Sequence, residues 1–125
     1  MIVYCCTDLI FGTKIRSTAQ AVGVPYRPAR NVEMVQARLD RVEDGKWNEP
    51  VTCVMVDLDL DETALEIIRC VKASDADIHV IAFGAHVATQ VLEAATESGA
   101  DQVLPRSNFA ANLPALLEQY GGSEL

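Results

Sequence analysis

Short apolar runs alternate along the chain with segments in which apolar residues recur at helical spacing. The runs are residues 2–6, 24–29, 51–56, 78–83 and 102–104, and the pattern predicts that each is a β-strand. Three of them, 2–6, 51–56 and 78–83, are apolar at nearly every position, which is typical of strands covered on both faces. In 24–29, Pro25 and Pro28 each remove a backbone donor, so we expect this strand at an edge of the sheet.

Five helices are predicted between and after these strands. Their apolar residues at helical spacing are Phe11, Ile15 and Val22; Val32, Val35, Leu39 and Val42; Leu65, Ile68 and Val71; Val87, Val91 and Ala95; and Leu113, Leu116 and Leu117. Thr7 or Asp8 is expected to cap the first helix, and Asn31 the second. Gly23 stands where the end of the first helix favours a left-handed residue.

Two segments need a separate interpretation. Pro114 would break the interior of the last helix, so we expect a looser turn from Ser107 and a regular helix that Asn112 caps. Residues 43–50 are polar and contain the only tryptophan, and the pattern predicts a loop there.

Five strands that alternate with five helices over short connections predict a parallel sheet with helices on both faces. The usual strand order at this size is 2-1-3-4-5, so we expect a flavodoxin-like α/β three-layer sandwich. A chain of 125 residues has the length of one domain. We place this domain at residues 1–120 and expect residues 121–125 to form a flexible tail.

Net charge, the length of the apolar runs and the spacing of the cysteines limit the classes of partner, the cellular location and the state of the thiols. Eighteen acidic and ten basic side chains give a net charge of −8, which repels a phosphate backbone, so no nucleic-acid partner is expected. The apolar runs are too short to span a bilayer and the start lacks a basic leader, so we expect a cytoplasmic protein with no membrane partner. The four cysteines have neither disulfide-like nor metal-ligand spacing, and we expect buried, reduced thiols.

Polar residues follow the strands at the edge where functional crevices of this fold lie. They are Thr7 and Asp8, then Asp57, Asp59 and Asp61, then Gly84 and His86, and finally Arg106. Asp57 directly follows the run 51–56, which is apolar except for Thr52. A carboxylate in this place can act as a nucleophile toward phosphoryl groups or as a magnesium ligand. It can equally end the strand and begin a turn, and the pattern alone leaves both interpretations open.

Two motifs carry a family resemblance: residues 54–59, with the sequence VMVDLD, and residues 98–101, with the sequence SGAD. On these anchors, essentially the whole chain resembles the CheY-like receiver domains of bacterial two-component response regulators. The resemblance implies that Asp57 is a candidate phosphoacceptor for a histidine kinase. It also implies that Asp8, Asp57 and Asp59 are candidate magnesium ligands.

The chain departs from the family at most of the helper positions. Receivers carry an acidic pair after the first strand, whereas Thr7 and Asp8 supply one carboxylate. Gly84 stands in place of the family threonine or serine, and Arg106 in place of the family lysine. The switch aromatic corresponds to Val103. Arginine keeps the positive charge of lysine but has a different donor geometry.

We therefore expect an atypical receiver, or pseudo-receiver: a stand-alone signalling domain, not an enzyme, that docks onto a histidine kinase or an effector. It requires no cofactor on this interpretation, and magnesium stays possible. If Arg106 reaches Asp57 or Asp8, a fixed guanidinium can hold one conformation permanently. The resemblance also implies a possible homodimer through the face of helix 4, strand 5 and helix 5. That region contains Val87, Val91, Leu92, Phe109 and Leu113.

Two other functions stay open. One is a conventional receiver that is phosphorylated at Asp57 with bound magnesium. The other is a flavodoxin-like protein that binds a nucleotide or flavin, because one fold hosts many functions. Residues 7–14 contain neither a G-x-G-x-x-G motif nor a phosphate loop, and Asp8 would repel a phosphate there, so the second alternative is the weaker one.

Overall fold

The computed structural model of the chain describes residues 1–84 and 89–122. The main strands are β1 (Ile2–Cys5), β2 (Tyr26–Pro28), β5 (Cys53–Asp57), β6 (His79–Gly84) and β7 (Gln102–Pro105). The helices are α1 (Leu9–Val22), α2 (Val32–Leu39), α3 (Glu62–Ser74), α4 (Thr89–Ser98) and α5 (Arg106–Tyr120), with a short 3-10 helix η1 (Leu58–Leu60) before α3. Two short strands, β3 (Val42–Glu43) and β4 (Lys46–Trp47), form a hairpin. His86, Val87 and the tail residues 123–125 lie outside the described residues, and the domain limits stay a prediction.

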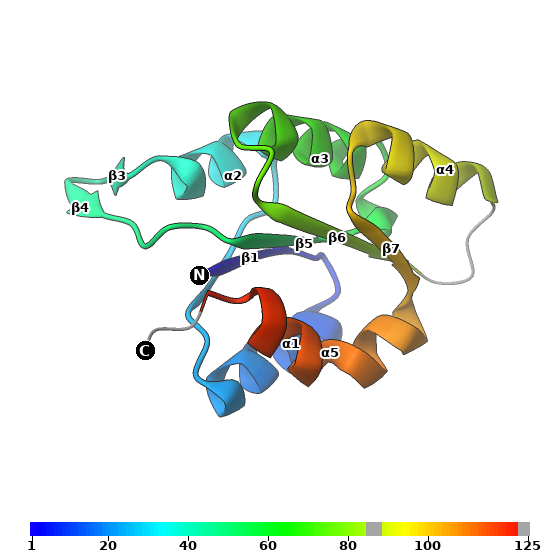
Figure 1. Cartoon of the computed structure of the whole chain (residues 1–125), viewed down its shortest axis with the longest axis horizontal. Coiled ribbons are helices and arrows are strands. Elements are labelled where there is room, and N and C mark those ends of the chain that lie inside the picture. The colour runs from blue at the N-terminus through cyan, green and yellow to red at the C-terminus, as the bar shows by residue number, and fades with distance from the viewer. Residues whose placement is uncertain (85–88, 123–125) are drawn as a thin grey trace.

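The five main strands form one parallel sheet in the order β2-β1-β5-β6-β7, which confirms the predicted topology. Helices α2, α3 and α4 cover one face, and α1 and α5 cover the other (Figure 1). The proline-containing strand β2 lies at an edge, as predicted. Among the helices of the two described ranges, none is both long and apolar enough to cross a membrane.

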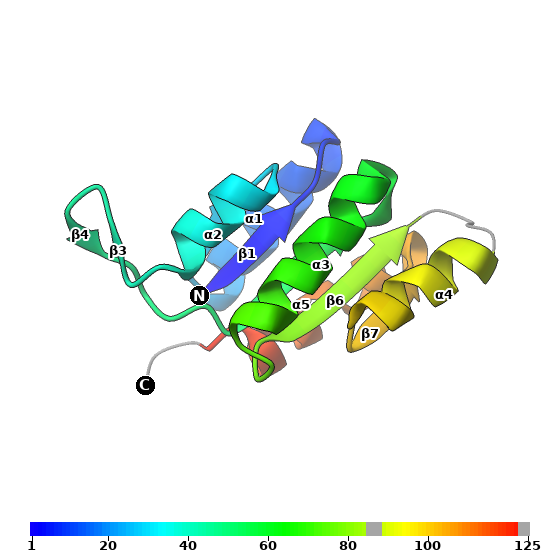
Figure 2. The same ribbon diagram turned by 90° about the horizontal axis from the view of Figure 1, so that it is seen from above.

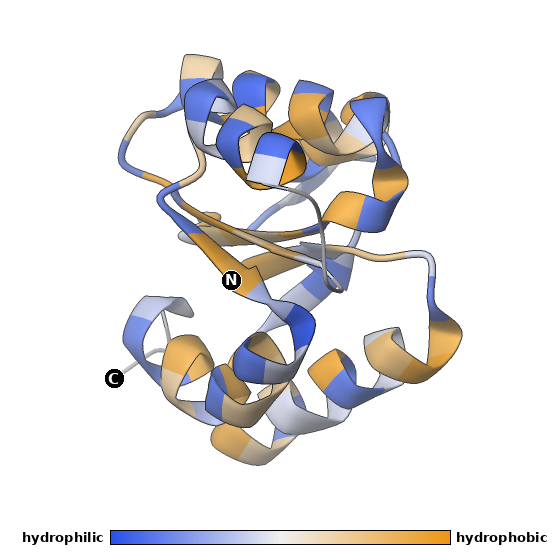
Figure 3. Cartoon of the chain, turned by 90° about the vertical axis from the view of Figure 1, so that its right-hand side faces the viewer, coloured by the Kyte–Doolittle hydropathy of each residue, from blue (hydrophilic) through white to orange (hydrophobic). Residues whose placement is uncertain are grey.

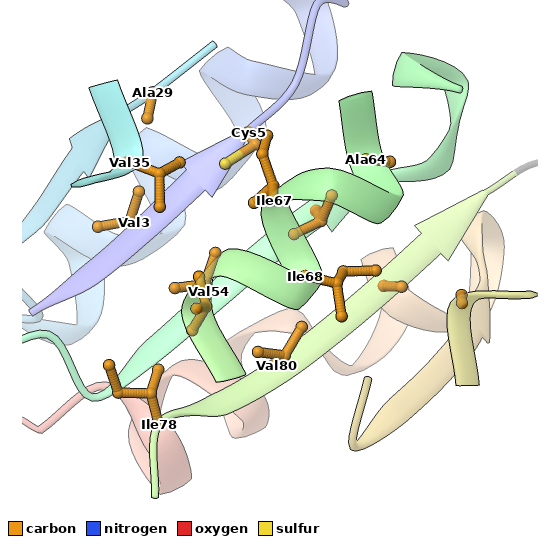
Figure 4. Packing of buried hydrophobic residues seen from close by; sticks show 14 of the residues in the cluster. Val3, Cys5, Ala29, Val35, Val54, Ala64, Ile67, Ile68, Ile78 and Val80 are labelled. Carbon is orange, nitrogen blue, oxygen red and sulfur yellow. The ribbon is translucent and has the colours of Figure 1, made fainter. Parts of the chain in front are cut away.

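The alternation of side chains along each strand divides the core into two layers, one on each face of the sheet. In Figure 3 the ribbon of the sheet is largely hydrophobic, whereas the helices carry both hydrophobic and hydrophilic residues. In β5, Val54 and Val56 pack toward α3, whereas Cys53 and Met55 pack toward α1 and α5. Figure 4 shows Val54 and Val80 beneath Ile67 and Ile68 of α3. Because both faces are covered, the central strands β1, β5 and β6 are apolar at nearly every position, and this explains the continuous runs in the sequence.

Helix α5 differs from the prediction. It is continuous from Arg106 to Tyr120 and contains Pro114, so Asn112 lies inside the helix and does not cap it. Pro114 is exposed on the solvent side, while Phe109, Leu113, Leu116 and Leu117 form a buried face. Burial of four large apolar side chains outweighs the local cost of the proline and its missing donor.

The segment predicted as a loop contains the β3–β4 hairpin. Asp44 and Gly45 adopt positive φ angles of 52° and 79°, which a two-residue hairpin turn requires, and the Asp-Gly pair is the sequence signal for such a turn. Val42, predicted on the second helix, instead pairs with Trp47 in the hairpin, because α2 ends at Leu39. The hairpin projects beyond α2 (Figure 2). Trp47 is 76% exposed on it.

A cluster of polar side chains anchors the hairpin to the domain. Arg38 and Asn48 are both buried, and Glu43 bridges the Arg38 and Arg27 guanidinium groups at 2.6 and 3.2 Å. The Asn48 amide donates to the carbonyl oxygens of Ala37 and Asp40. Since buried polar groups hold their geometry only when they are paired, this satisfied network fixes the hairpin against α2.

Asp101, from the SGAD motif, ties the start of β7 to the rest of the sheet. Its carboxylate accepts from the Val80 backbone N–H at 2.8 Å and pairs with Lys72 Nζ at 2.6 Å. Burial works to raise the pKa of Asp101, but the Lys72 and Val80 contacts outweigh it and lower that pKa below its ordinary value. Gly99, with a φ of 116°, supplies the turn that brings Asp101 into place.

Asp101 therefore predicts a pH-dependent part of the stability. A carboxylate whose pKa is lower in the folded state stabilises the fold above its unfolded pKa, near 4, and this contribution is lost as the pH falls through the folded pKa. We expect Asp101→Asn to be less stable than the wild type at pH 7 and the gap to narrow below about pH 4. Urea unfolding at a series of pH values measures the gap, and a gap that stays constant down to pH 2 contradicts the assignment.

Candidate functional site

The strands run in one direction, so their carboxyl ends meet at one edge of the sheet (Figure 2). The side chains of Cys6, Asp8, Asp57, Asp59 and Arg106 come together at this edge. Asp57 is the last residue of β5, and its side chain points toward the α1 and α5 face because it shares the parity of Cys53 and Met55. Arg106 is the first residue of α5 and approaches Asp57 from that face.

Asp57 is a buried carboxylate with partners on both oxygens. Its side chain is 1% exposed. Oδ1 accepts from Arg106 Nη2 at 2.9 Å and from the Asp59 backbone N–H at 2.9 Å. Oδ2 accepts from the Cys6 thiol at 3.3 Å. The aspartate begins the η1 turn, as one interpretation of the sequence predicted, and it is also enclosed in an ionic network. Its role as a nucleophile or a magnesium ligand stays a prediction.

Arg106 lies between three carboxylates. Its Nη2 is 2.9 Å from Asp57 and 3.0 Å from Asp59, and its Nη1 is 3.7 Å from Asp8. The guanidinium also lies over the rings of Phe11 and Phe83, at 5.1 and 5.9 Å from the ring centroids. A guanidinium presents several donors in a rigid fork, which allows one side chain to hold several carboxylates together.

The position of Arg106 has a cost in free energy, because one of its donors is left without a partner in the part of the chain that the structure describes. Its Nε is buried and has no hydrogen-bond partner among the described residues. An unpaired buried donor costs about 1–3 kcal/mol, so the charged contacts must outweigh this penalty for the conformation to persist. The aromatic surface below the guanidinium contributes to them through cation–π attraction.

Cys6 is a member of the site that the sequence interpretation missed. Its thiol faces Asp57, and it is partly exposed rather than buried, as is Cys70, so the expectation of four buried thiols was wrong for these two. Burial, together with the hydrogen bond to the Asp57 carboxylate, raises the pKa of the Cys6 thiol to about 12. The thiol therefore stays protonated and acts as a donor. Its place as the last residue of the apolar run 2–6, directly before Thr7 and Asp8, was the only signal for it.

The three carboxylates that are candidate magnesium ligands are arranged around the Arg106 guanidinium and not around a site for a divalent ion. Asp8 Oδ1 already caps α1 by accepting from the Ile10 and Phe11 N–H groups at 2.9 and 3.1 Å. Asp57 and Asp59 each direct an oxygen at Arg106 Nη2. Within the described ranges, no group of three or more His, Cys, Asp or Glu side chains is arranged to hold a metal ion. The cation between these carboxylates is the guanidinium.

The other candidate residues contribute less. Gly84 ends β6 beside Pro105 of β7 and offers no side-chain donor. Asp61 lies beyond the network, before α3, and Thr7 is exposed. Val103 is partly buried against the core beneath α2, α3 and α4.

The fold is that of a flavodoxin-like α/β protein. Its polar crevice lies at the carboxyl edge of the sheet, between neighbouring strands that are followed by helices on opposite faces. No protein-family profile matches the sequence, and no curated protein matches it.

Solved structures match almost the whole chain and have the receiver-domain, CheY-like fold. A response regulator from Thermotoga maritima is 18% identical with a TM-score of 0.76, covering 98% of this chain and 97% of that chain. The phosphorylated cyanobacterial phytochrome response regulator RcpA is 12% identical with a TM-score of 0.77, covering 99% and 95%. The Mn²⁺-bound form of response regulator Rcp1 is 10% identical with a TM-score of 0.72, covering 99% and 96%. The chain therefore has the receiver fold that the sequence resemblance predicted.

Proposed function

We propose that this chain is an atypical receiver domain that acts in signal transduction by docking onto a partner protein, without phosphoryl switching. The observation that supports the proposal most directly is the pairing of Arg106 with the buried Asp57 carboxylate. A phosphoryl donor must reach an oxygen of Asp57, and both oxygens are occupied within a side chain that is 1% exposed. Phosphorylation at Oδ1 therefore requires that Arg106 move, and phosphorylation at Oδ2 requires that Cys6 move.

Two further features favour a fixed conformation. Arg106 supplies a permanent positive charge where a receiver uses magnesium and a lysine, so on this proposal no cofactor is required. Gly84 has no hydroxyl with which to bind a phosphoryl group and move its loop. Even a phosphorylated Asp57 would lack this contact, and the modification would change the surface less than in a conventional receiver.

The proposed partner is a histidine kinase or an effector protein, and the proposed location is the cytoplasm. Four free thiols are consistent with a reducing compartment. The face formed by α4, β7 and α5 is the candidate homodimer surface. Of its described apolar residues, Phe109 and Leu113 are fully buried in the core, whereas Leu92 is half-buried and Val91 is 38% exposed, so Leu92 and Val91 retain surface that can contribute to a contact.

A conventional phosphoaccepting receiver is the second candidate. Asp57 lies at the carboxyl end of a central strand, beside Asp8 and Asp59, and one structural neighbour is phosphorylated while another binds Mn²⁺. This function requires Arg106 to release the three carboxylates when a metal ion and a phosphodonor arrive.

The two candidates differ in a direct experiment. The chain is incubated with a small-molecule phosphodonor and Mg²⁺ and its intact mass is measured, with Asp57→Asn as the site control and an active receiver as the positive control. We expect no stoichiometric gain of a phosphoryl group under conditions that fully modify the positive control. A stoichiometric gain that Asp57→Asn abolishes overturns the proposal and establishes the conventional receiver.

A further inference from the structure

A groove between α3 and α4 lies next to the Asp57 turn but outside the ionic network. It has a volume of about 290 Å³ and an apolar floor made by Leu58, Leu65, Val91 and Ala94. The two helices lie side by side on one face of the sheet (Figures 1 and 2). Arg69 of α3 donates to Ser98 at the end of α4, which joins the helices there, so the groove opens near their amino ends.

The groove combines an apolar floor with an acidic rim. Val91 is 38% exposed, and Leu65 is half-buried. Asp61 and Glu62 form the rim, and both are exposed. Within the described ranges, no lysine, arginine or histidine lies at ion-pair distance from either carboxylate.

Asp61 has no structural role in the local fold that explains why a carboxylate stands at this position. It precedes α3 but makes no side-chain capping hydrogen bond. Its backbone has φ 57° and ψ −127°, a conformation that costs a non-glycine residue free energy and holds the side chain at the rim. Glu62, in the first turn of α3, gains some stabilisation from the helix dipole, and its carboxylate is still exposed to solvent.

We infer that this groove binds a basic amphipathic helix of the partner protein. Apolar side chains of that helix would cover Leu65 and Val91, and its lysine or arginine side chains would pair with Asp61 and Glu62. Charge complementarity selects a cationic partner, because the rim is acidic and the chain has a net charge of −8. The groove volume is at the lower limit for small-molecule pockets, which suits protruding side chains better than a large ligand.

The inference rests on the proposed docking function and names the surface that carries it. Leu58 in the groove floor follows Asp57 directly, and Asp59 of the same turn pairs with Arg106. A partner in the groove would therefore contact the turn whose conformation the ionic network fixes.

The test uses a fluorescent peptide of about 14 residues, built from leucine and lysine with one apolar stripe at helical spacing. A second peptide has the same composition in an order without a stripe. Fluorescence anisotropy measures both affinities. We expect the striped peptide to bind at least about tenfold more tightly, because only it presents leucines and lysines on separate faces. Equal affinity for the two peptides overturns the inference.

Matched variants locate the binding surface. Val91→Ser removes an apolar contact without adding a charge and is expected to weaken striped-peptide binding at least about tenfold. Val42→Ser makes the same change at an exposed valine on the hairpin and is expected to leave the affinity unchanged. Equal effects of the two variants contradict docking in the groove.

Charge specificity needs its own control because the whole chain is acidic. Asp61→Asn with Glu62→Gln is expected to weaken binding roughly three- to tenfold at low salt. Glu33→Gln with Glu118→Gln changes the net charge equally at exposed positions on α2 and α5 and should have no comparable effect. Equal losses mean non-specific attraction and overturn the inference. Failure here leaves the phosphodonor result on Asp57 unchanged, so the two proposals fail separately.

Discussion

Replacing Arg106 with alanine is expected to lower the free energy of unfolding by about 2–3 kcal/mol. The substitution leaves the Asp57 carboxylate buried without its cation, beside Asp8 and Asp59, and removal of one partner of a buried ion pair is strongly destabilising. Loss of the unpaired Arg106 Nε offsets part of the cost. Thermal unfolding followed by circular dichroism should show a melting temperature lower by roughly 8–12 °C.

A double-mutant cycle separates this electrostatic effect from lost packing. In the Arg106→Ala background, Asp57→Asn neutralises the unpaired charge and should recover part of the stability. In the wild-type background, Asp57→Asn removes the ionic partner of Arg106 and should destabilise the chain. An unchanged melting temperature for Arg106→Ala, or equal effects of Asp57→Asn in both backgrounds, would contradict the stabilising role assigned to the Arg106–Asp57 ion pair.

Phe83→Ala is expected to cost about 3–5 kcal/mol, a loss typical of a large aromatic side chain removed from a core. Phe83 is fully buried and stacks on Phe109 with 4.1 Å between ring centroids and 7° between ring planes. It also contacts Phe11 and lies below the Arg106 guanidinium. The substitution leaves a cavity and removes part of the surface that positions the arginine.

Trp47→Ala is the matched control for this prediction. Tryptophan is larger than phenylalanine, but Trp47 is 76% exposed and its ring contacts Arg41 only through a cation–π interaction at 5.7 Å. We expect a change in the free energy of unfolding within about 1 kcal/mol. Urea titration of both variants provides the comparison, and a Phe83→Ala loss no larger than that of Trp47→Ala contradicts the described core.

The sheet and its order were predictable because they follow from burial on both faces. Continuous apolar strands and short connections leave few topologies, and local caps such as Asp8 and Asn31 act as the sequence indicates. The predictions fail where two local signals compete. The predicted break at Pro114 is wrong because the buried face of α5 outweighs the local cost of the proline, and residues 43–50 contain a hairpin because Asp44 and Gly45 form a tight turn within a polar segment.

The sequence predicts which residues form the site better than it predicts how those residues contact one another. Strand ends identify Asp8, Asp57, Asp59 and Arg106 because parallel strands bring their carboxyl ends to one edge. The sequence does not specify that one guanidinium spans three carboxylates, since this depends on the first turn of α5 reaching over the Phe11 and Phe83 rings. Cys6 could not be assigned for the same reason, because its role depends on which oxygen of Asp57 is not bound by Arg106 and can accept from the thiol.

The anchored hairpin has a practical consequence for optical work on this chain. Its tryptophan is the only one in the sequence, and it lies in solvent, away from both apolar layers. Indole emission should therefore change little when the interior melts and should respond mainly to events at the hairpin itself. Loss of the native state is better followed through backbone ellipticity, and the indole is left as a local reporter for ligands or proteins that approach this end of the molecule.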